Sequence, residues 1–144
     1  MNKYPQLKLE NQLCFPLYAC SKEIVRRYTP FLEEIGLTYT QYITMMVMWE
    51  EEEITVKKLG EKLLLDSGTL TPVIKKLETK GLIKKSRNKE DERSVIIRIT
   101  EKGRDLYENA KEIPEKVGGC LSMERKDAED LYKLLNKLMA VISE

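Results

Sequence analysis

Apolar residues recur with helical spacing through the first third of the chain. This period predicts one long helix from about Leu9 to Glu34, with Gly36 as its C-cap. Pro16 and Pro30 both fall inside the predicted helix. Because each proline removes a backbone donor and crowds the preceding turn, we expect the helix to bend at both positions.

A capping motif and an apolar run predict the second helix. Thr38 followed by Gln41 has the form of a capping box, and residues 42–49 are mainly apolar. This run is far too short to cross a bilayer, so we expect a mostly buried helix. The first residues also lack the basic-then-apolar pattern of a secretion signal, and we expect a cytoplasmic protein.

The next segment has the outline of a helix-turn-helix. Thr55 is placed to cap a short helix over 56–63, residues 65–69 provide a turn, and a further helix ends at Gly81. The later helix opens with small hydroxyl residues and continues into lysines, which is typical of a DNA-reading helix. The same pattern also fits an ordinary helical hairpin.

A charged and then β-branched stretch follows at once. Residues 82–87 and 95–99 read as two strands of a hairpin whose tip, 88–92, is highly charged. The net charge of the whole chain is only +1, but residues 75–98 contain nine basic and four acidic side chains. A helix-turn-helix with a basic hairpin predicts a mainly α fold with a small β wing, a winged helix-turn-helix suited to contact DNA phosphates.

Two further helices are predicted to close the chain. Thr100 caps the first, Pro114 and then Gly118 and Gly119 interrupt it, and Ser122 begins the second. We expect one domain over residues 1–144. Its terminal parts, 1–36 and 101–144, are expected to form a dimer interface, and 37–100 the DNA-binding region. An intramolecular helical bundle would also cover these apolar stripes.

The chain has three cysteines, Cys14, Cys20 and Cys120, and no histidine. Without an imidazole, Ser-His and Cys-His nucleophile activation and His-bearing zinc sites are excluded. There is also no Cys-x-x-Cys pair to indicate structural zinc. We therefore expect no enzyme, no catalytic residue, no metal and no cofactor. An odd number of cysteines in a reducing compartment indicates either buried structural thiols or a reactive one.

Cys14 is the candidate reactive thiol. It lies in the first turns of the predicted first helix, where unpaired amides and the positive end of the helix dipole stabilise an anion. A thiolate attacks a peroxide O–O bond and becomes a sulfenic acid, which a thiol can reduce again. A buried cysteine that acts only as a small hydrophobe is the alternative.

Four short strings carry a family resemblance: Asn11–Phe15 (NQLCF), Gly36–Tyr39 (GLTY), Leu65–Pro72 (LDSGTLTP) and Glu90–Arg93 (EDER). With its long first helix, helix-turn-helix, basic wing and closing helices, the chain resembles the MarR family of dimeric repressors over essentially its full length. Through these strings it is similar to the organic hydroperoxide sensors of that family. The resemblance implies a repressor that binds double-stranded operator DNA as a homodimer, with no membrane partner.

The resemblance places the fourth helix in the major groove and the wing near the minor groove. Arg93 would enter the minor groove, while Asp91 would hold a neighbouring arginine such as Arg87. Two heads on a two-fold axis imply an inverted-repeat operator with half-sites about 10 bp apart. The residues matched to the DNA-reading helix are Ser67, Gly68, Thr69, Thr71, Lys75 and Lys76.

The resemblance also implies how the thiol is held and oxidised. Tyr28 and Tyr39 match the two tyrosines that bond the sensing cysteine across the dimer interface, and an organic hydroperoxide is the implied oxidant. Cys120 resembles the resolving thiol of two-cysteine members, and we expect it in a mobile loop after the Gly118-Gly119 break. A mixed disulfide between Cys14 and a small cellular thiol would serve the same purpose.

The remaining cysteine and two departures complete the expectations. Cys20 lies six residues from Cys14 on the same predicted helix, a rise of about 9 Å on a different face, so the two cannot form a disulfide. We expect Cys20 to be structural. Pro16, and Thr40 where related sequences often have proline, depart from the family pattern and bear on how Cys14 is presented.

Three other functions fit parts of this pattern. A MarR-type regulator released by a small aromatic ligand would keep the fold and use Cys14 only for packing. A thiol peroxidase would use Cys14 catalytically, with turnover of peroxide. A helical protein-interaction module would have no DNA role.

Overall fold

Seven α-helices, two 3-10 turns and three β-strands make up residues 3–143, the part of the chain that the computed structural model describes. The elements are η1 (Pro5–Leu7), η2 (Leu9–Asn11), α1 (Cys14–Glu34), α2 (Tyr39–Glu51), β1 (Glu53–Thr55), α3 (Val56–Leu63), α4 (Ser67–Thr79), β2 (Ile83–Arg87), β3 (Val95–Ile99), α5 (Glu101–Ala110), α6 (Ile113–Leu121) and α7 (Arg125–Ile142). The expected mainly α fold with a small β wing is confirmed.

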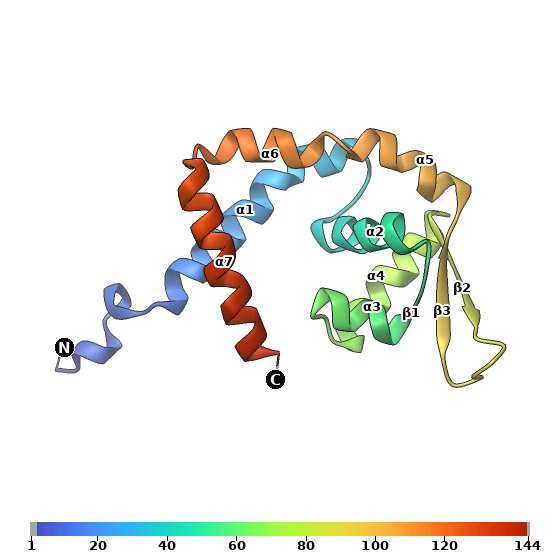
Figure 1. Ribbon diagram of the computed structural model, residues 1–144, viewed down its shortest axis with the longest axis horizontal. Coiled ribbons are helices and arrows are strands. Elements are labelled where there is room, and N and C mark those ends of the chain that lie inside the picture. The colour runs from blue at the N-terminus through green and yellow to red at the C-terminus, as the bar shows by residue number, and fades with distance from the viewer. Residues whose placement is uncertain (1–2, 144) are drawn as a thin grey trace.

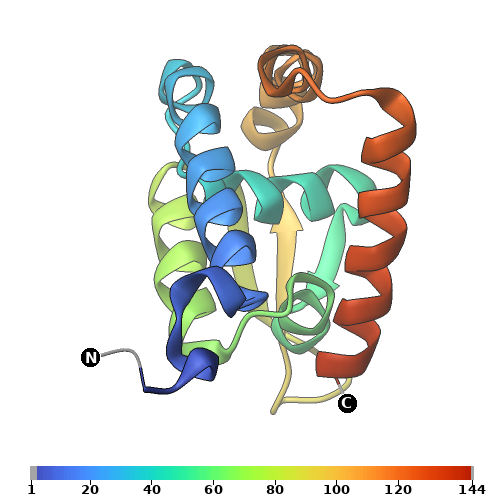
Figure 2. The same ribbon diagram turned by 90° about the vertical axis from the view of Figure 1, so that its left-hand side faces the viewer.

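The elements form an arch with two unequal legs. Helices α5 and α6 run along the top, and α2, α3, α4 and the sheet hang beneath α5 as a compact head (Figure 1). Helix α7 and the N-terminal half of α1 form the other leg, and α7 stands apart from α4 when the molecule is turned (Figure 2). The core lies in the head, where Met45, Met48, Leu59, Leu77 and Ile97 are almost fully buried. No residue of α7 between 125 and 142 is buried.

Helix α1 begins five residues later than the pattern predicts. The side chains of Asn11 and Gln12 donate to nearby backbone carbonyls, at 2.8 Å from Pro5 O and 2.6 Å from Gln6 O, and these local bonds compete with the helical ladder. Pro16 then falls in the first turn of α1, where its missing N–H has no intrahelical role. A proline in the first turn breaks no hydrogen bond of the helix, so Pro16 gives no reason for the bend that was predicted there. Pro30 lies inside the helix as expected.

The predicted helix ends and caps of the head are confirmed. Gly36 and Gly81 both adopt a positive φ, at 70° and 73°, and end the helices before them. Thr38 and Gln41 form both bonds of the capping box, and Thr55 accepts the N–H of Lys58 at the start of α3. The sequence pattern therefore fixes where the helices of the head start and stop.

The sheet has one strand more than the sequence pattern indicates. β3 lies between β2 and the short β1, and both pairings are antiparallel. Ile54 of β1 pairs with Ile97 of β3, and both side chains are buried. The sequence pattern does not predict β1, because three residues that follow an acidic run are too few to show the alternation of a strand.

The closing helices differ from the prediction at two points. Thr100 caps α5 as expected, and Pro114 lies in the first turn of α6. Gly118 and Gly119 do not interrupt a helix, because both lie inside α6. Ser122 is the left-handed C-cap of α6, with φ 47°, and α7 begins only at Arg125. Among residues 3–143, no helix is long and apolar enough to cross a membrane.

Candidate DNA interface and thiol site

Every α4 residue predicted to contact DNA lies on the exposed side of the helix. Its apolar residues Leu70, Val73, Ile74 and Leu77 are buried against the head, which turns the remaining positions outward. The exposed positions include Ser67, Gly68, Thr69, Thr71, Lys75 and Lys76. The core-facing stripe of α4 therefore determines which side chains are available to a partner.

Two of the predicted hydroxyls are bonded within the helix. Asp66 caps α4 by accepting the backbone N–H of Thr69 over 2.8 Å, and this bond holds the pKa of the Asp66 carboxyl below its usual value. The hydroxyls of Thr69 and Thr71 donate to Asp66 Oδ2 and Ser67 O, at 3.3 and 2.7 Å. Each hydroxyl keeps its acceptor lone pairs, so in this arrangement the threonines can accept hydrogen bonds from a ligand.

The predicted cations of α4 and the wing are exposed. Within residues 3–143, Lys75, Lys76, Arg87 and Arg93 form no salt bridge, whereas Arg98 is paired with Glu53. Exposed cations without acidic partners are the groups that phosphates attract most strongly. These four cations are therefore available to an anionic partner, although the chain as a whole is almost neutral.

A hollow of about 500 Å³ lies between the start of α3, α4 and the wing. Thr71 and Arg93, both predicted to contact DNA, line it together with Lys57 and Lys85. Lys57 is not among the predicted DNA contacts, although its place in the first turn of α3, beside the Thr55 cap, is visible in the sequence. The hollow brings together basic side chains from three separate elements.

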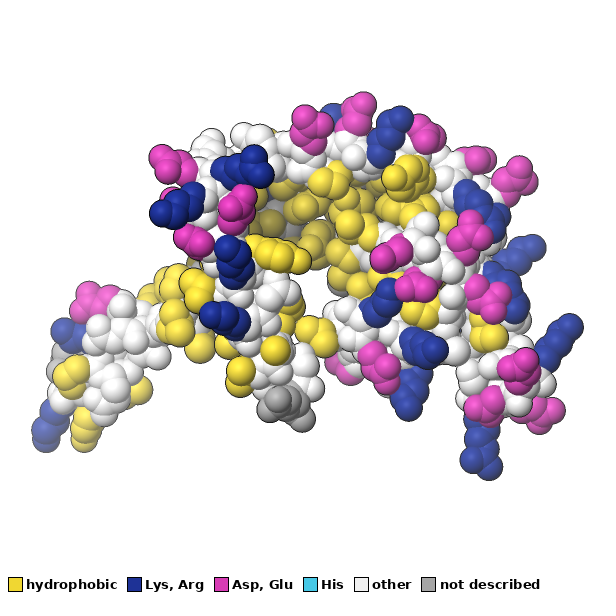
Figure 3. Space-filling model, viewed as in Figure 1, with side chains coloured by type: hydrophobic (Ala, Val, Ile, Leu, Met, Phe, Trp, Pro, Cys, Tyr) yellow, Lys and Arg dark blue, Asp and Glu magenta, His cyan; other side chains and the backbone are white. Residues whose placement is uncertain are grey.

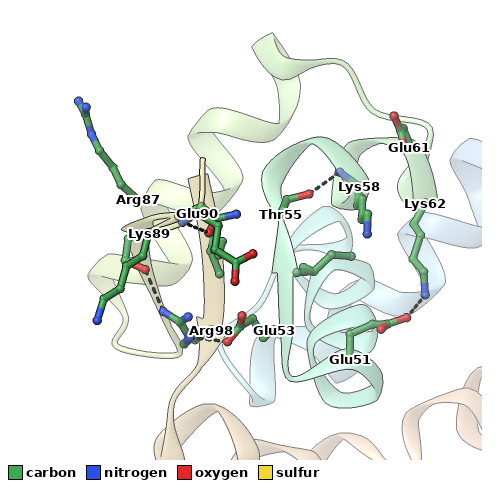
Figure 4. Close-up of a pocket in the computed structure, with 14 residues that line it drawn as sticks. Glu51, Glu53, Thr55, Lys58, Glu61, Lys62, Arg87, Lys89, Glu90 and Arg98 are labelled. Atoms are coloured by element: carbon green, nitrogen blue, oxygen red, sulfur yellow. Dashed lines mark hydrogen bonds and ion pairs between the residues drawn. The ribbon is translucent and has the colours of Figure 1, made fainter. Parts of the chain in front are cut away.

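A second and larger groove, of about 1120 Å³, separates α3 from the opposite side of the wing (Figure 4). Across it, Arg98 of β3 bonds Ser86 at 3.0 Å and pairs with Glu53 of β1, which ties the wing to the short strand. Arg87 extends away from the other labelled side chains. Acidic and basic residues line this groove in similar numbers, so it has no strong preference for an anion.

The expected pairing of Asp91 with Arg87 is wrong. Asp91 Oδ1 instead accepts the backbone N–H of Arg93 over 3.1 Å, and no salt bridge joins Asp91 to an arginine within residues 3–143. A carboxylate two residues before an amide readily closes such a local turn. Asp91 therefore shapes the wing tip from which the Arg93 side chain projects.

Cys14 is exposed at the first residue of α1. No side chain caps this end of the helix, and Pro16 contributes no N–H, so the amides of the first turn are unpaired. Leu13 and Phe15, the neighbours of Cys14 in the chain, are 79% and 43% exposed and do not enclose the thiol. Trp49 packs between Tyr42 and Tyr107.

The two predicted tyrosines lie together at the other end of α1. The rings of Tyr28 and Tyr39 meet edge to face, with centroids 5.2 Å apart. Burial raises the pKa of Tyr28, so its phenol remains a hydrogen-bond donor. Fourteen helical residues separate Cys14 from Tyr28, about 21 Å along α1, so a contact between them requires two chains.

The other two cysteines differ from expectation in burial or in position. Cys20 is exposed on α1 and is not a buried structural residue of this chain. Cys120 lies in the last turn of α6 and not in a loop, and its carbonyl oxygen accepts a hydrogen bond from the Arg27 guanidinium of α1. Among the described residues, no cluster of three or more Cys, Asp or Glu is placed to hold a metal ion.

Comparisons with known proteins decide the family. Residues 26–110 match the family described as transcriptional regulator SarA/Rot. The organic hydroperoxide resistance transcriptional regulator of Bacillus subtilis is 48% identical over 141 residues, which cover 98% of this chain and 94% of that protein. The chain belongs to the MarR-type winged helix-turn-helix transcriptional regulators, as its sequence motifs indicated.

Two solved structures of AbfR from Staphylococcus epidermidis resemble this MarR-type regulator closely. Reduced AbfR bound to DNA is 32% identical, with a TM-score of 0.79 over 96% of this chain and 97% of AbfR. A disulfide-formed AbfR is 33% identical, with a TM-score of 0.62 over 93% of this chain and 94% of that chain. The MarR-type fold thus accounts for the helix-turn-helix, the wing and the closing helices together.

Proposed function

We propose that this transcriptional regulator binds an inverted-repeat operator as a homodimer, represses transcription, and leaves DNA when an organic hydroperoxide oxidises Cys14. The observation that carries the proposal is the position of Cys14, exposed at the start of α1 and about 21 Å from the Tyr28–Tyr39 pair. The 48% identity to an organic hydroperoxide resistance regulator supports the same chemistry.

The apolar surface of the second leg supports a homodimer. Leu131, Leu134 and Leu138 of α7 are exposed, and hydrophobic side chains gather in the hollow beneath α6 (Figure 3). A single helix without tertiary packing is marginal in water, so α7 needs a partner surface. A second copy supplies that surface and brings its Tyr28 and Tyr39 within reach of Cys14. Residues 1–36 and 101–144 would then form the dimer interface, with 1, 2 and 144 outside the described residues.

The exposed face of α4 supports DNA binding. Lys75 and Lys76 lie on it and form no salt bridge within residues 3–143, and Arg93 adds a third such cation on the wing. AbfR, which shares this fold, has been solved bound to DNA. We assign base and phosphate contacts in the major groove to Ser67, Gly68, Thr69, Thr71, Lys75 and Lys76. Arg87 and Arg93 act from the wing, where Asp91 shapes the tip.

The proposed chemistry is a two-electron oxidation of sulfur. The Cys14 thiolate attacks one peroxide oxygen of ROOH, the O–O bond breaks, and a proton from solvent completes the alcohol ROH and Cys14–SOH. The Cys120 thiolate of the partner then attacks the sulfenic sulfur and displaces hydroxide, which takes a proton from solvent to become water, and an interchain disulfide remains. Oxidation removes the thiolate that the phenols of Tyr28 and Tyr39 would stabilise, and the dimer loses that restraint.

The decisive experiment combines a non-reducing gel with a DNA-binding assay. The duplex is selected from a randomised pool by reduced wild-type protein, and wild type is compared with Cys14→Ser and Cys120→Ser after stoichiometric organic hydroperoxide. We expect a dimer band and loss of duplex binding in wild type, with no band in either variant. Release of Cys14→Ser from DNA by hydroperoxide would overturn the redox mechanism.

The same samples distinguish the other functions. Catalytic turnover of hydroperoxide with a dithiol reductant would indicate a thiol peroxidase, whereas one oxidation per chain fits the sensor. Release of Cys14→Ser by a small phenol alone would indicate an aromatic-ligand regulator. If reduced wild type binds no duplex, the DNA-binding role fails and an interaction module remains. Binding that weakens steeply with salt is expected for phosphate contacts.

A further inference from the structure

One side chain joins the C-terminal end of α4 to the turn between α1 and α2. The Lys80 ammonium donates to the carbonyl oxygen of Gly36, directly after α1, and to Gln41 Oε1 of α2 over 3.1 Å. Gln41 is only 3% exposed, and the same Oε1 accepts the N–H of Thr38 over 3.2 Å. Because this amide belongs to the capping box of α2, it is a fixed acceptor for Lys80.

The backbone at the same point is bonded to α5. Lys102 Nζ donates to the carbonyl oxygen of Lys80 over 2.8 Å, and Thr100 Oγ1 donates to that of Gly81 over 2.6 Å. The ends of α1 and α4 and the starts of α2 and α5 therefore meet around Lys80. Helix α1 carries Cys14 and Tyr28, so this junction connects the thiol-bearing helix to the helix proposed to read DNA.

We propose that Lys80 is a positioning residue that couples the orientation of α4 to the state of α1. The inference rests on the proposed function, which it extends from the site of oxidation to the helix that responds. The buried contacts of α4 are apolar and non-directional, whereas the Lys80 bonds fix a direction. From Lys80 to Ser67 the helix extends about 20 Å, so a tilt of about 5° at Lys80 moves its reading end by nearly 2 Å.

The test measures the ratio of duplex affinities in the reduced and hydroperoxide-treated states, with the duplex selected by reduced wild type. Lys80→Met keeps the aliphatic stem but removes the donors, and Lys80→Arg keeps them. Lys111→Met is the control, because Lys111 pairs only with Glu108 of its own helix within residues 3–143. We expect Lys80→Met to lower the ratio about three- to tenfold, and Lys80→Arg and Lys111→Met to stay within about twofold of wild type.

The salt dependence separates positioning from a direct phosphate contact. If Lys80 only positions α4, the slope of log affinity against log salt is the same in Lys80→Met and wild type. A slope that falls by about one unit would identify Lys80 as a phosphate contact and overturn the proposal. An unchanged affinity ratio in Lys80→Met would also overturn it while leaving the proposed function intact. A wild type that binds no duplex, or does not respond to hydroperoxide, would instead overturn the proposed function.

Discussion

The indole N–H of Trp49 donates a hydrogen bond to the carbonyl oxygen of Gly103 over 2.8 Å. This bond joins the last turns of α2 to the first turn of α5, and Arg104 strengthens the same junction by pairing with Glu52 at 3.1 Å. The Trp49 ring also meets that of Tyr107 edge to face, with centroids 5.7 Å apart. The head is therefore fixed to the top of the arch at the point where the chain leaves the wing.

Replacing Trp49 tests this junction. Trp49→Phe keeps an aromatic ring but removes the donor, so we expect the free energy of unfolding to fall by about 1–2 kcal/mol. Chemical denaturation followed by circular dichroism measures the change. Trp49 is the single tryptophan, so wild-type fluorescence should report the same transition. Equal stability of the two proteins would mean that solvent replaces the indole at Gly103.

Gly103 itself tests how closely α5 lies against the end of the head. A Cβ at this position would lie 2.3 Å from the backbone oxygen of Leu82, so Gly103→Ala forces the two segments apart. We expect a loss of about 3 kcal/mol in the free energy of unfolding. Gly118→Ala is the matched control: nothing lies within 4 Å of its added Cβ, and helix α6 should gain about 0.5–1 kcal/mol. Similar effects at both glycines would contradict the close approach.

The sequence predicts the head well because its elements end at residues with a clear local preference. Thr38, Thr55 and Thr100 cap helices, while Gly36 and Gly81 adopt the left-handed conformation that ends them. Each of these preferences depends on contacts within a few consecutive residues, so a short segment of sequence is enough to predict the helix end. The exposed face of α4 follows for the same reason, from the period of its apolar residues.

The terminal regions are predicted less well because tertiary contacts and local side-chain bonds decide them. Periodicity carries α1 back to Leu9, but Asn11 and Gln12 bond their own backbone and hold the segment in 3-10 turns. The glycines before Cys120 suggest a break, yet α6 continues through them because Ile113 and Val117 are buried. The site proposed around Cys14 is not completed within one chain, since Tyr28 of the same chain is about 21 Å away along α1.

The phenol of Tyr28 gives a prediction for alkaline pH. Burial, with a smaller contribution from Tyr39, raises the pKa of Tyr28 above its ordinary value of 10.0. The unfolded chain releases this proton first, so its contribution to stability is complete below pH 10 and is lost as the pH rises through the folded-state pKa. Phenolate absorbance should show a late-titrating component that is smaller in Tyr28→Phe. An unchanged late component in Tyr28→Phe would contradict this assignment.

Arg27 should control how readily Cys120 can reach a sulfenic acid. Its guanidinium donates to the carbonyl oxygen of Cys120 and so holds the last turn of α6 against α1. A disulfide with Cys14 of the partner requires the Cys120 thiol to move, and Gly118 and Gly119 already weaken the helix before it. Arg27→Met removes the restraint, and we expect the disulfide to form about two- to tenfold faster after a single dose of hydroperoxide.

The control for Arg27 lies one residue before it. Arg26 bonds Glu23 of its own helix at 2.7 Å and has no bond to α6 within residues 3–143, so Arg26→Met makes the same charge change without releasing Cys120. Quenched samples on non-reducing gels measure the rate of disulfide formation, and a sulfenic-acid probe on Cys120→Ser measures the first oxidation separately. Arg27→Met should leave that first step unchanged. Equal disulfide rates in Arg27→Met and Arg26→Met would mean that the last turn of α6 opens freely without regard to Arg27.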